Sequence, residues 1–308
     1  MWTRARFVNE YIPGLFAVAI DTYNTNRAKS MWDQLVTVKT SNKKKEENTE
    51  RSGLDAPYLK VEGAPIQYDI QIQGAKQSWV HDVYALGVRI TEEAVDDNLY
   101  ELSGGSEGEL KEIFHDLGEA MSNNMEVLIA RFLNSGSATT YHTERNGATA
   151  LYSASHALLD NTAFSNLSTN ADLTYTAFWS VLVAAENQYN HRGHRVQKKV
   201  EKLWIPPQLE RAATEVLKSP DRPDTANRTV SAYAKSGRNI SVKNWNQLTD
   251  TDAWHLQLEG QGIIFFWRRK TRFGRDGDFQ TGDVMVKADQ RFSAEINDYR
   301  CFYGNIPS

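Results

Sequence analysis

Cysteine is almost absent from this chain, which has a single one, Cys301, among its 308 residues. A lone cysteine excludes an intramolecular disulfide and any zinc site built from several thiolates. Long apolar runs are missing too. The longest, at 14–20 and 263–267, are far shorter than the roughly 20 residues that a membrane-spanning helix needs. We therefore expect a soluble, cytosolic chain with no membrane partner.

An excess of positive charge is also lacking. Lys and Arg number 35 against 39 Asp and Glu, which gives a formal net charge of -4. A protein that coats nucleic acid is usually clearly basic, so this balance argues against that class. Hydrophobic residues make up 40% of the chain, and 308 residues are enough to bury a substantial core. The composition predicts an ordinary globular protein of one large or two smaller domains.

Catalytic motifs are the third absence. A match to the serine-hydrolase pattern G-x-S-x-G occurs in "GGSEG", whose serine is Ser106. That chemistry needs the serine on a sharp turn after a buried strand, whereas Ser106 follows an acidic segment and is placed to cap a helix. Ser153, Ser155, His156 and Asp160 are close in sequence, which is no evidence for a triad in space. We expect no enzymatic activity and no cofactor.

Two histidines, His191 and His194, lie in the segment "QYNHRGHRVQKK" on either side of Gly193. A glycine between them favours a turn over a rigid helical face, and the zinc motif H-E-x-x-H does not occur. Two histidines without a third ligand nearby in the sequence make an incomplete metal site. We therefore expect a solvated interaction loop and no bound metal, with metal binding as the weaker alternative.

The strongest periodic pattern in the chain predicts a long amphipathic helix over residues 106–134. Its apolar residues recur at helical spacing, with polar residues on the opposite face. They are Leu110, Ile113, Phe114, Leu117, Met121, Met125, Leu128 and Phe132. Ser106 and Glu109 fit a capping box at the start, and Gly136 lies just beyond the end. At 1.5 Å per residue this helix is roughly 40 Å long, so we expect it to be the spine of a domain.

Residues 38–80 predict an extended, two-stranded excursion from the body of the protein. The stretch 39–51 carries blocks of both charges and almost no apolar residue. The stretch 66–72 alternates Ile or Tyr with Gln or Asp, which predicts a strand with one apolar face. Such a protrusion cannot bury its own core, and its open strand edges need cover from another molecule. Disorder of 39–51 is the alternative interpretation.

The rest of the chain predicts mixed helices and strands, and so an α+β fold. A helix is expected at 175–189, and a buried strand that runs into a helix at 200–218. Short strands and turns follow. Within them, the basic cluster 268–275, which begins with Arg268 and Arg269, is the best candidate for binding nucleic acid. The net charge favours a different interpretation, a charged strand edge that pairs with an acidic neighbour.

Several segments resemble, in their order along the chain, the major capsid proteins of tailed bacteriophages with the Hong Kong 97-type fold. The nearest branch is the one similar to the Mu-like major head subunit. "WDQLVTVKTSNKKKE" resembles the passage from N-terminal arm to extended loop, "EGAPIQYD" the returning half of that loop, and "LGVRITEEAVDDNLY" the strand before the spine helix. The later family segments are resembled by "LYSASHALL", "LWIPPQLERAATEVL", "LTDTDAWHL" and "RFSAEINDYRCFYG". Ala157 stands where a proline is common in the family.

This resemblance implies a Hong Kong 97-like organisation in five parts. They are an N-terminal arm at 1–37, an extended β-hairpin loop at 38–80, a peripheral domain with the spine helix at 81–150, an axial domain at 151–266, and C-terminal strands returning to the peripheral domain at 267–308. It also implies hexamers and pentamers that close into the icosahedral shell of a virion around double-stranded DNA, after assembly in the host cytoplasm. Further copies of the chain would be its main partners. Scaffolding, portal and decoration or cement proteins would be others, and the packaged DNA would be held through weak contacts.

We expect the residues that serve assembly to lie on the arm, the loop, the histidine segment and the basic cluster. They are Phe16, Trp32, Lys43, Lys44, Lys45, Glu46, Glu47, Leu59, Glu62, Ile66, Tyr68, Ile70, His191, His194, Arg268 and Arg269. Mixed charge in the loop would set the register between neighbours more than it adds affinity. Two alternatives stay open: a nucleic-acid-binding protein that uses Arg268–Arg275, and an encapsulin-like compartment shell.

Overall fold

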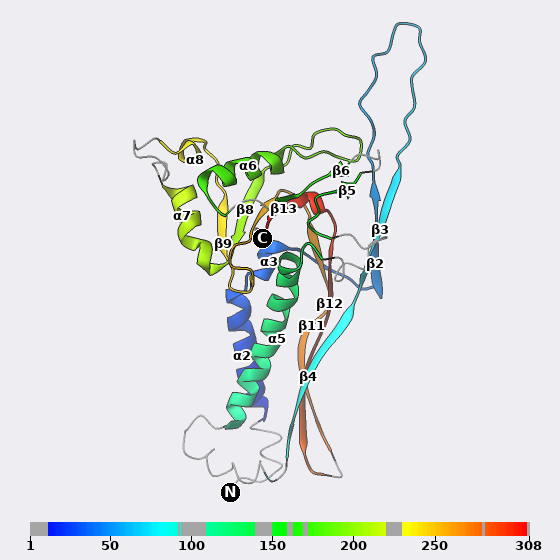
Figure 1. Cartoon of the computed structure of the whole chain (residues 1–308). Helices are drawn as coiled ribbons and strands as arrows, with labels where there is room; N and C mark the ends of the chain where they lie inside the picture. Colours follow the sequence, from blue (N-terminus) through cyan, green and yellow to red (C-terminus); the bar gives the residue numbers. More distant parts are fainter. Residues whose placement is uncertain are drawn as a thin grey trace.

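The computed structural model describes residues 12–91, 93, 109–138, 150–158, 163–168, 172–219, 230–278 and 281–306. A pair of long helices lies beside a sheet of long strands, a second sheet sits at one end of them, and a narrow loop projects from the body (Figure 1). Among the helices in these ranges, none is both long and apolar enough to cross a bilayer.

The two long helices are α2 (Ile12–Lys29) and α5 (Glu109–Asn134), which pack side by side (Figure 1). The end of α5 is where the periodic pattern predicts it, and the expected capping residues before 109 lie outside the described residues. Gly118 permits the close approach, because a Cβ there would lie 2.4 Å from the carbonyl oxygen of Ala19. The close approach of the two helices at this point therefore requires a residue without a side chain.

The long sheet is antiparallel except for its first pair and covers one side of the helix pair. Its order is β1 (Thr37–Thr40), β11 (Ile263–Gly277), β12 (Val284–Ile296) and β4 (Asp82–Ile90). Val284, Val286 and Ala288 of β12 pack with Phe114 and Leu117 of α5 in one apolar cluster. The alternation of inward and outward side chains along β12 thus joins the sheet to the helices.

The second sheet has five strands with three helices around it. In order across the sheet the strands are β7 (Leu167–Ser168), β13 (Phe302–Asn305), β10 (Trp254–Leu258), β8 (Val200–Ile205) and β9 (Ser241–Asn244). The helices are α6 (Tyr175–Glu186), α7 (Glu210–Lys218) and α8 (Ala232–Lys235). A short 3-10 helix, η3 (Pro207–Leu209), joins β8 to α7, so the strand-to-helix unit expected at 200–218 is confirmed.

The end of the chain corrects one expectation. The strands after 267 were expected to return to the domain of the spine helix, and β11 and β12 do so. The last strand, β13, pairs instead with β10 and β7 in the five-stranded sheet. The turn η4 (Tyr299–Cys301) redirects the chain between the two sheets.

A cluster of aromatic residues fills the junction between the two sheets and the C-terminal end of α5. Trp32, in α3 (Trp32–Leu35), is fully buried there, with its ring centroid 4.6 Å from that of Phe265 and 6.4 Å from that of Trp267. The prediction that Trp32 serves assembly is therefore wrong in this structure, since its ring packs inside its own subunit. An indole ring buries a large apolar area, which explains why the end of the N-terminal arm, near Trp32, packs into this core.

Candidate assembly interface

The extended loop comprises residues 38–80 and is built on a two-stranded ladder. β2 (Lys45–Arg51) pairs antiparallel with β3 (Gln73–Val80), from Lys45 opposite Val80 to Arg51 opposite Gln73. The charged stretch expected as either a strand or disorder is thus a strand. Residues 52–72 form no strand, although 66–72 alternates like one. The alternating segment has no partner strand, and a strand needs a neighbour to satisfy its backbone groups.

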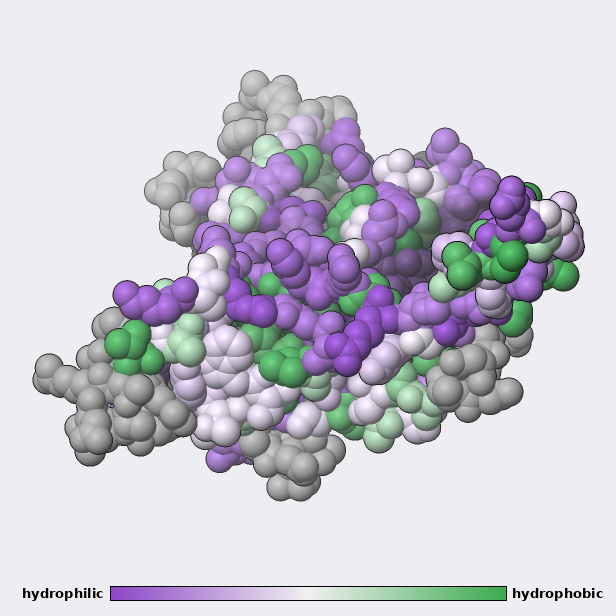
Figure 2. Space-filling view, turned by 90° about the horizontal axis from the view of Figure 1, so that it is seen from above, coloured by the Kyte–Doolittle hydropathy of each residue, from purple (hydrophilic) through white to green (hydrophobic). Residues whose placement is uncertain are grey.

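The projecting half of the loop is rich in exposed apolar side chains. Leu59 and Tyr68 are 95% and 92% exposed. The other large apolar residues exposed there are Leu54, Tyr58, Val61, Ile66, Ile70 and Ile72. Figure 2, which looks down on the loop at the right-hand end of the molecule, shows these hydrophobic residues mixed with hydrophilic ones. Exposed apolar surface of this extent marks a site for contact with another macromolecule.

The charged side chains at the base of the loop pair with one another. Lys43 contacts Glu46 at 3.1 Å, and Glu47 lies between Lys45 and Lys76. The two lysines lower the pKa of Glu47 to about 2, with Lys45 the larger cause. A hydrogen bond from the hydroxyl of Ser41 is the main cause of the lowered pKa of Glu46. Ion pairs as exposed as these add little to the stability of the subunit. Their charges can therefore serve to orient a neighbouring subunit.

Three contacts join the extended loop to the histidine turn, residues 189–195. His191 Nε2 lies 2.6 Å from Glu50 Oε1, and His194 Nε2 lies 2.7 Å from Asp55 Oδ1. The turn is closed by backbone bonds and by Gly193, whose φ of 75° suits glycine. His191 is buried and His194 half-buried. The expectation of a solvated loop is therefore wrong for His191, because carboxylates distant in sequence cover it.

Arg192 makes the third contact, between the two histidines. Its guanidinium donates to the carbonyl of Ile70 at 2.7 Å and to both carboxylate oxygens of Asp69 at 3.3 Å. The pKa of Asp69 is lowered, first by the N–H groups of Asp55 and Ile70 and then by Arg192. The pKa of Asp55 is lowered by the N–H of Ala56 and then by His194. His191, Arg192 and His194 of the turn thus hold acidic residues of the loop.

Behind the histidine turn lies a buried network that no sequence pattern indicates. Arg300 donates to Nδ1 of His191 at 3.1 Å, to the carbonyl of Tyr189 at 3.1 Å and to Glu50 at 3.5 Å. Next to it, Lys198 donates to Asp298 at 2.6 Å. Burial alone raises the pKa of Asp298, but Lys198 and Arg300 hold it below its ordinary value. The partners come from three distant parts of the chain, near residues 50, 189–198 and 298–300, so no local motif indicates them.

The base of the loop is also fixed on the long sheet. Gln77 donates to the carbonyl of Asn297 at 2.6 Å, and Trp79 packs edge-on against Phe266. His81, the residue between β3 and β4, has its Nδ1 2.8 Å from the hydroxyl of Ser293. Burial is the main cause of the lowered pKa of His81. The loop thus leaves the body in a direction set by packing and hydrogen bonds.

The remaining expected assembly residues lie elsewhere. Phe16 is half-buried, with its ring centroid 5.3 Å from that of Phe114, so α2 packs on α5 of its own chain. Arg269 and Arg272 both bind Asp289 of the neighbouring strand. Burial raises the pKa of Asp289, but the two arginines lower it overall. The structure therefore contains a charged strand edge that pairs with an acidic neighbour, the interpretation favoured over a nucleic-acid site. Arg268 is half-buried beside this pair.

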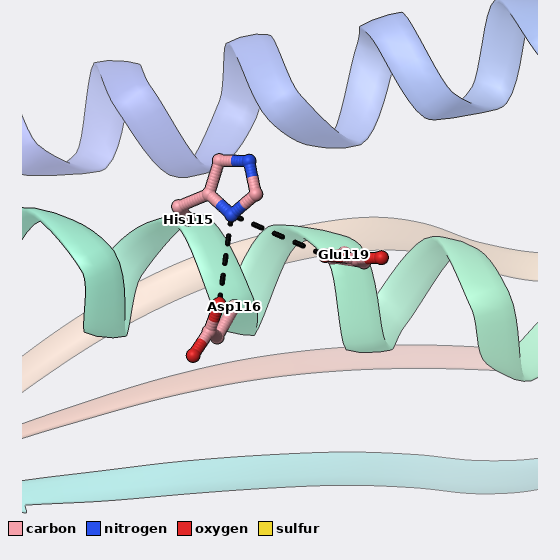
Figure 3. Close-up of side chains that lie close together, drawn as sticks. All are labelled: His115, Asp116 and Glu119. Carbon is pink, nitrogen blue, oxygen red and sulfur yellow. Dashed lines mark ion pairs between the residues drawn. The ribbon is translucent and has the colours of Figure 1, made fainter.

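One exposed group on α5 has the residue types of a metal site. His115 Nδ1 lies 3.5 Å from Asp116 Oδ1 and 4.0 Å from Glu119 Oε2 (Figure 3). All three side chains are exposed on one turn, and the spacing of His115 and Glu119 is the ordinary i, i+4 spacing of paired side chains on a helix. Helix geometry therefore accounts for the group without a metal.

The described fold combines the long helix α5, two sheets and an anchored, projecting loop. The family model for phage capsid proteins matches residues 76–305. The chain therefore belongs to the phage capsid protein family and is a major capsid protein, which forms a viral shell. This is a structural family and not a class of enzymes.

Solved structures agree on the fold. The chain is similar to the capsid of cyanophage P-SCSP1u, with 12% identity, a TM-score of 0.55 and coverage of 91% of this chain and 88% of that one. It is similar to the capsid of Myoviridae phage XM1, with 8% identity, a TM-score of 0.52 and coverage of 89% and 90%. These likenesses define a mixed helix-and-sheet fold of the Hong Kong 97 type.

An encapsulin has the same fold. The holo-SrpI encapsulin complex from Synechococcus elongatus is similar with 10% identity, a TM-score of 0.50 and coverage of 88% of this chain and 84% of that one. Identities this low show a shared fold alone. A comparison with curated proteins finds no significant match.

Proposed function

We propose that this chain self-assembles into hexamers and pentamers, which close into an icosahedral shell around double-stranded phage DNA. The observation that carries the proposal is the extended loop, which is anchored at its base and exposes apolar side chains along its projecting half. A lone subunit gains nothing from keeping Leu59 and Tyr68 in water. Covering them on a neighbour makes many modest contacts, and closed symmetry repeats each of them around the shell.

The residues proposed for contact between subunits are those exposed on the loop. They are Lys43, Lys44, Lys45, Glu47, Leu59, Glu62, Ile66, Tyr68 and Ile70. The histidine turn has a supporting role, because it holds the loop in its projecting position, and Glu46 braces Ser41 and Lys43 at the base of the loop. The half-buried Arg268 and Arg269, and Phe16 on α2, are proposed only as secondary contacts. The apolar residues supply the affinity and the charged ones the register.

The domain roles implied by the resemblance are part of the proposal. The five-stranded sheet with α6, α7 and α8 would form the axial domain near the capsomer centre. The spine helix and long sheet would form the peripheral domain. We also propose the Mu-like head subunit branch on the order of the sequence segments, with assembly in the host cytoplasm and scaffolding, portal and decoration proteins as further partners. The DNA would be enclosed through weak contacts, since the net charge is -4.

An encapsulin-like compartment is the second candidate, favoured by the similarity to the encapsulin complex. The two candidates differ in what the shell encloses. A phage shell purified from its natural source contains double-stranded DNA. A compartment contains enzyme cargo and no genome.

The test is negative-stain electron microscopy and sedimentation of the chain expressed alone. Closed shells, or rings of five and six subunits, are the expected result. A stable monomer or dimer at every concentration would contradict self-assembly. Salt-dependent DNA binding by such a monomer would favour the nucleic-acid alternative.

A further inference from the structure

A lysine, an aspartate and the single cysteine of the chain meet behind the histidine turn. Lys198 Nζ lies 2.6 Å from Asp298 Oδ2 and 3.2 Å from Cys301 Sγ, although 103 positions separate the lysine from the cysteine. The third side of the triangle is closed as well, because Sγ lies 3.7 Å from Asp298 Oδ2. Cys301 is 1% exposed, and the other two residues are half-buried beside it. An amine, a carboxylate and a thiol are thus in mutual contact at the edge of the core.

The backbone at Gly260 confines the sulfur and the ammonium group to this contact. A Cβ at this position would lie 2.9 Å from Cys301 Sγ and 3.7 Å from Lys198 Nζ. Gly260 also has a φ of 124°, which residues with a side chain rarely adopt. On the same side, the thiol donates to the carbonyl of Glu259 at 3.6 Å. The fold therefore has a glycine where a larger residue would displace the sulfur atom.

The surroundings keep the thiol of Cys301 out of ordinary thiolate chemistry. Burial raises its pKa to about 12, and Asp298 adds to this effect. Burial alone would lower the pKa of Lys198, but Asp298 and Cys301 raise it overall. A buried, protonated thiol is a poor nucleophile toward alkylating agents and disulfides. The reagent that can reach this sulfur is a small uncharged oxidant such as dioxygen.

We propose that Lys198 and Cys301 are a site of covalent modification, at which dioxygen joins Nζ to Sγ through one oxygen atom. To form this N–O–S bridge, the S–H bond and one N–H bond of the neutral amine break, and an S–O bond and an O–N bond form. Sulfur reaches the oxidation level of a sulfenic acid, and nitrogen that of a hydroxylamine. Each of them loses two electrons, and dioxygen accepts all four. The second oxygen atom leaves as water with the two released hydrogens.

Asp298 supplies the base that this reaction needs. The amine reacts only after the ammonium group has lost a proton, and Asp298 Oδ2 is the acceptor at hydrogen-bond distance. The other oxygen, Oδ1, accepts from the backbone N–H of Arg300 at 3.0 Å, which keeps Oδ2 directed at the lysine. The side chain of Asp298 is partly exposed, so the proton can pass on to water.

The bridge clips two distant parts of the chain together. Lys198 precedes β8 of the five-stranded sheet, and Cys301 ends η4, the turn between the two sheets. Closing so long a loop removes conformational entropy from the unfolded chain, as a disulfide does. Arg300, next to the cysteine, holds Glu50 and His191. The modification therefore stiffens the network that anchors the extended loop, an effect that goes beyond the proposed assembly function.

Mass spectrometry of subunits purified under argon and then exposed to air tests the proposal. The exposed parent should gain one oxygen and lose two hydrogens, and digestion should yield a peptide pair linked through Lys198 and Cys301. Reduction of the unfolded chain should restore the original mass. The air-exposed parent should also unfold about 5 °C higher than the sample kept under argon.

Three variants complete the design. Lys198→Arg keeps the positive charge beside Asp298 but removes the primary amine, and Cys301→Ser removes the sulfur. Neither should form the linked pair or gain stability in air. The matched control is Lys199→Arg, at the exposed neighbouring position, which should still form the bridge.

An unchanged mass of the parent after exposure to air would overturn the inference. A linked pair without the added oxygen would overturn it too. So would equal addition of oxygen to Cys301 in the parent and in Lys198→Arg, because that result is oxidation of the cysteine alone. Should Lys198→Arg fail to fold, Cys301→Ser gives the same comparison of stability in air and under argon. Shell formation is measured separately, so a failure of assembly bears only on the proposed function.

Discussion

His191 Nε2 lies 2.6 Å from Glu50 Oε1, although 141 positions separate the two residues in the chain. Arg300 contacts both of them from the C-terminal segment. The contact fixes the base of the extended loop to the body, so the loop is held in its projecting position before any neighbour arrives. Such preorganisation lowers the conformational entropy lost on association. We infer that the buried network serves assembly indirectly, through the direction of the loop.

Glu50→Gln should destabilise the subunit by about 1–3 kcal/mol, because it removes the charge that His191 and Arg300 face inside the protein. The control is Glu47→Gln, which alters an exposed ion pair in the same strand and should leave the free energy of unfolding close to that of the parent. Urea unfolding of unassembled subunits measures both values. Equal effects of the two variants would show that the buried contact has no special role.

Trp32→Ala and Leu59→Ala should separate stability from assembly. Trp32 is fully buried, so its truncation should cost about 3–5 kcal/mol of unfolding free energy. Leu59 is 95% exposed, so its truncation should change that free energy by less than about 0.5 kcal/mol. Only Leu59→Ala should leave a normally stable subunit, and that variant should need a higher protein concentration than the parent before shells form. Unfolding curves and sedimentation decide the matter, and normal assembly of Leu59→Ala would contradict the role given to the loop.

Gly118→Ala should destabilise the helix pair by about 1–3 kcal/mol, because the added methyl group would overlap the backbone of Ala19. Gly14→Ala is the matched control in α2, where an added Cβ meets nothing within 4 Å. Alanine is the better helix former, so this control should be neutral or stabilising by up to about 1 kcal/mol. Thermal unfolding of the two variants gives the comparison. A stable Gly118→Ala subunit would mean that α2 does not pack on α5 as described.

His255 should make the subunit less stable in mild acid. Its ring is buried against Tyr152, and burial lowers its pKa from 6.5 to about 3. The unfolded chain takes up a proton near pH 6.5, whereas the folded chain does not until about pH 3, so stability falls as the pH decreases between these values. At about pH 5 the loss relative to neutral pH is about 2 kcal/mol.

His255→Phe keeps a flat ring against Tyr152 and removes this titration. The slope of unfolding free energy against pH between about 6.5 and 5 should therefore decrease by up to one proton per molecule. His115→Phe, on the exposed face of α5, is the control for the substitution itself. An unchanged slope for His255→Phe would show that the buried ring is not the group responsible.

The sequence predicts the elements whose pattern is local. The apolar stripe of α5 and the passage from β8 into α7 follow from periodicity and from the prolines between them, and the structure has both. The segment 66–72 has an equally clear pattern but forms no strand, because a strand depends on a neighbour that the subunit does not contain.

The candidate site could be predicted only in outline. The loop is recognisable from its charged stretch and alternating segment, but its anchoring is not. Glu50, His191 and Arg300 are far apart in the chain, and none lies in a motif that indicates the others. The prediction for Trp32 is wrong for a related reason: a large aromatic residue in an N-terminal arm can pack in the core of its own subunit or at an interface, and composition does not distinguish the two.

Deletion of 54–70 from the loop, with a short Gly-Ser link that preserves the β2–β3 ladder, tests the central claim most directly. Electron microscopy and sedimentation of the parent and the deletion variant, expressed side by side, give the result, with thermal unfolding as the check on folding. The account predicts closed shells from the parent. It predicts none from the variant, whose subunit should unfold at nearly the parent temperature. Shells of normal size and yield from the variant would contradict the claim that the extended loop joins the subunits.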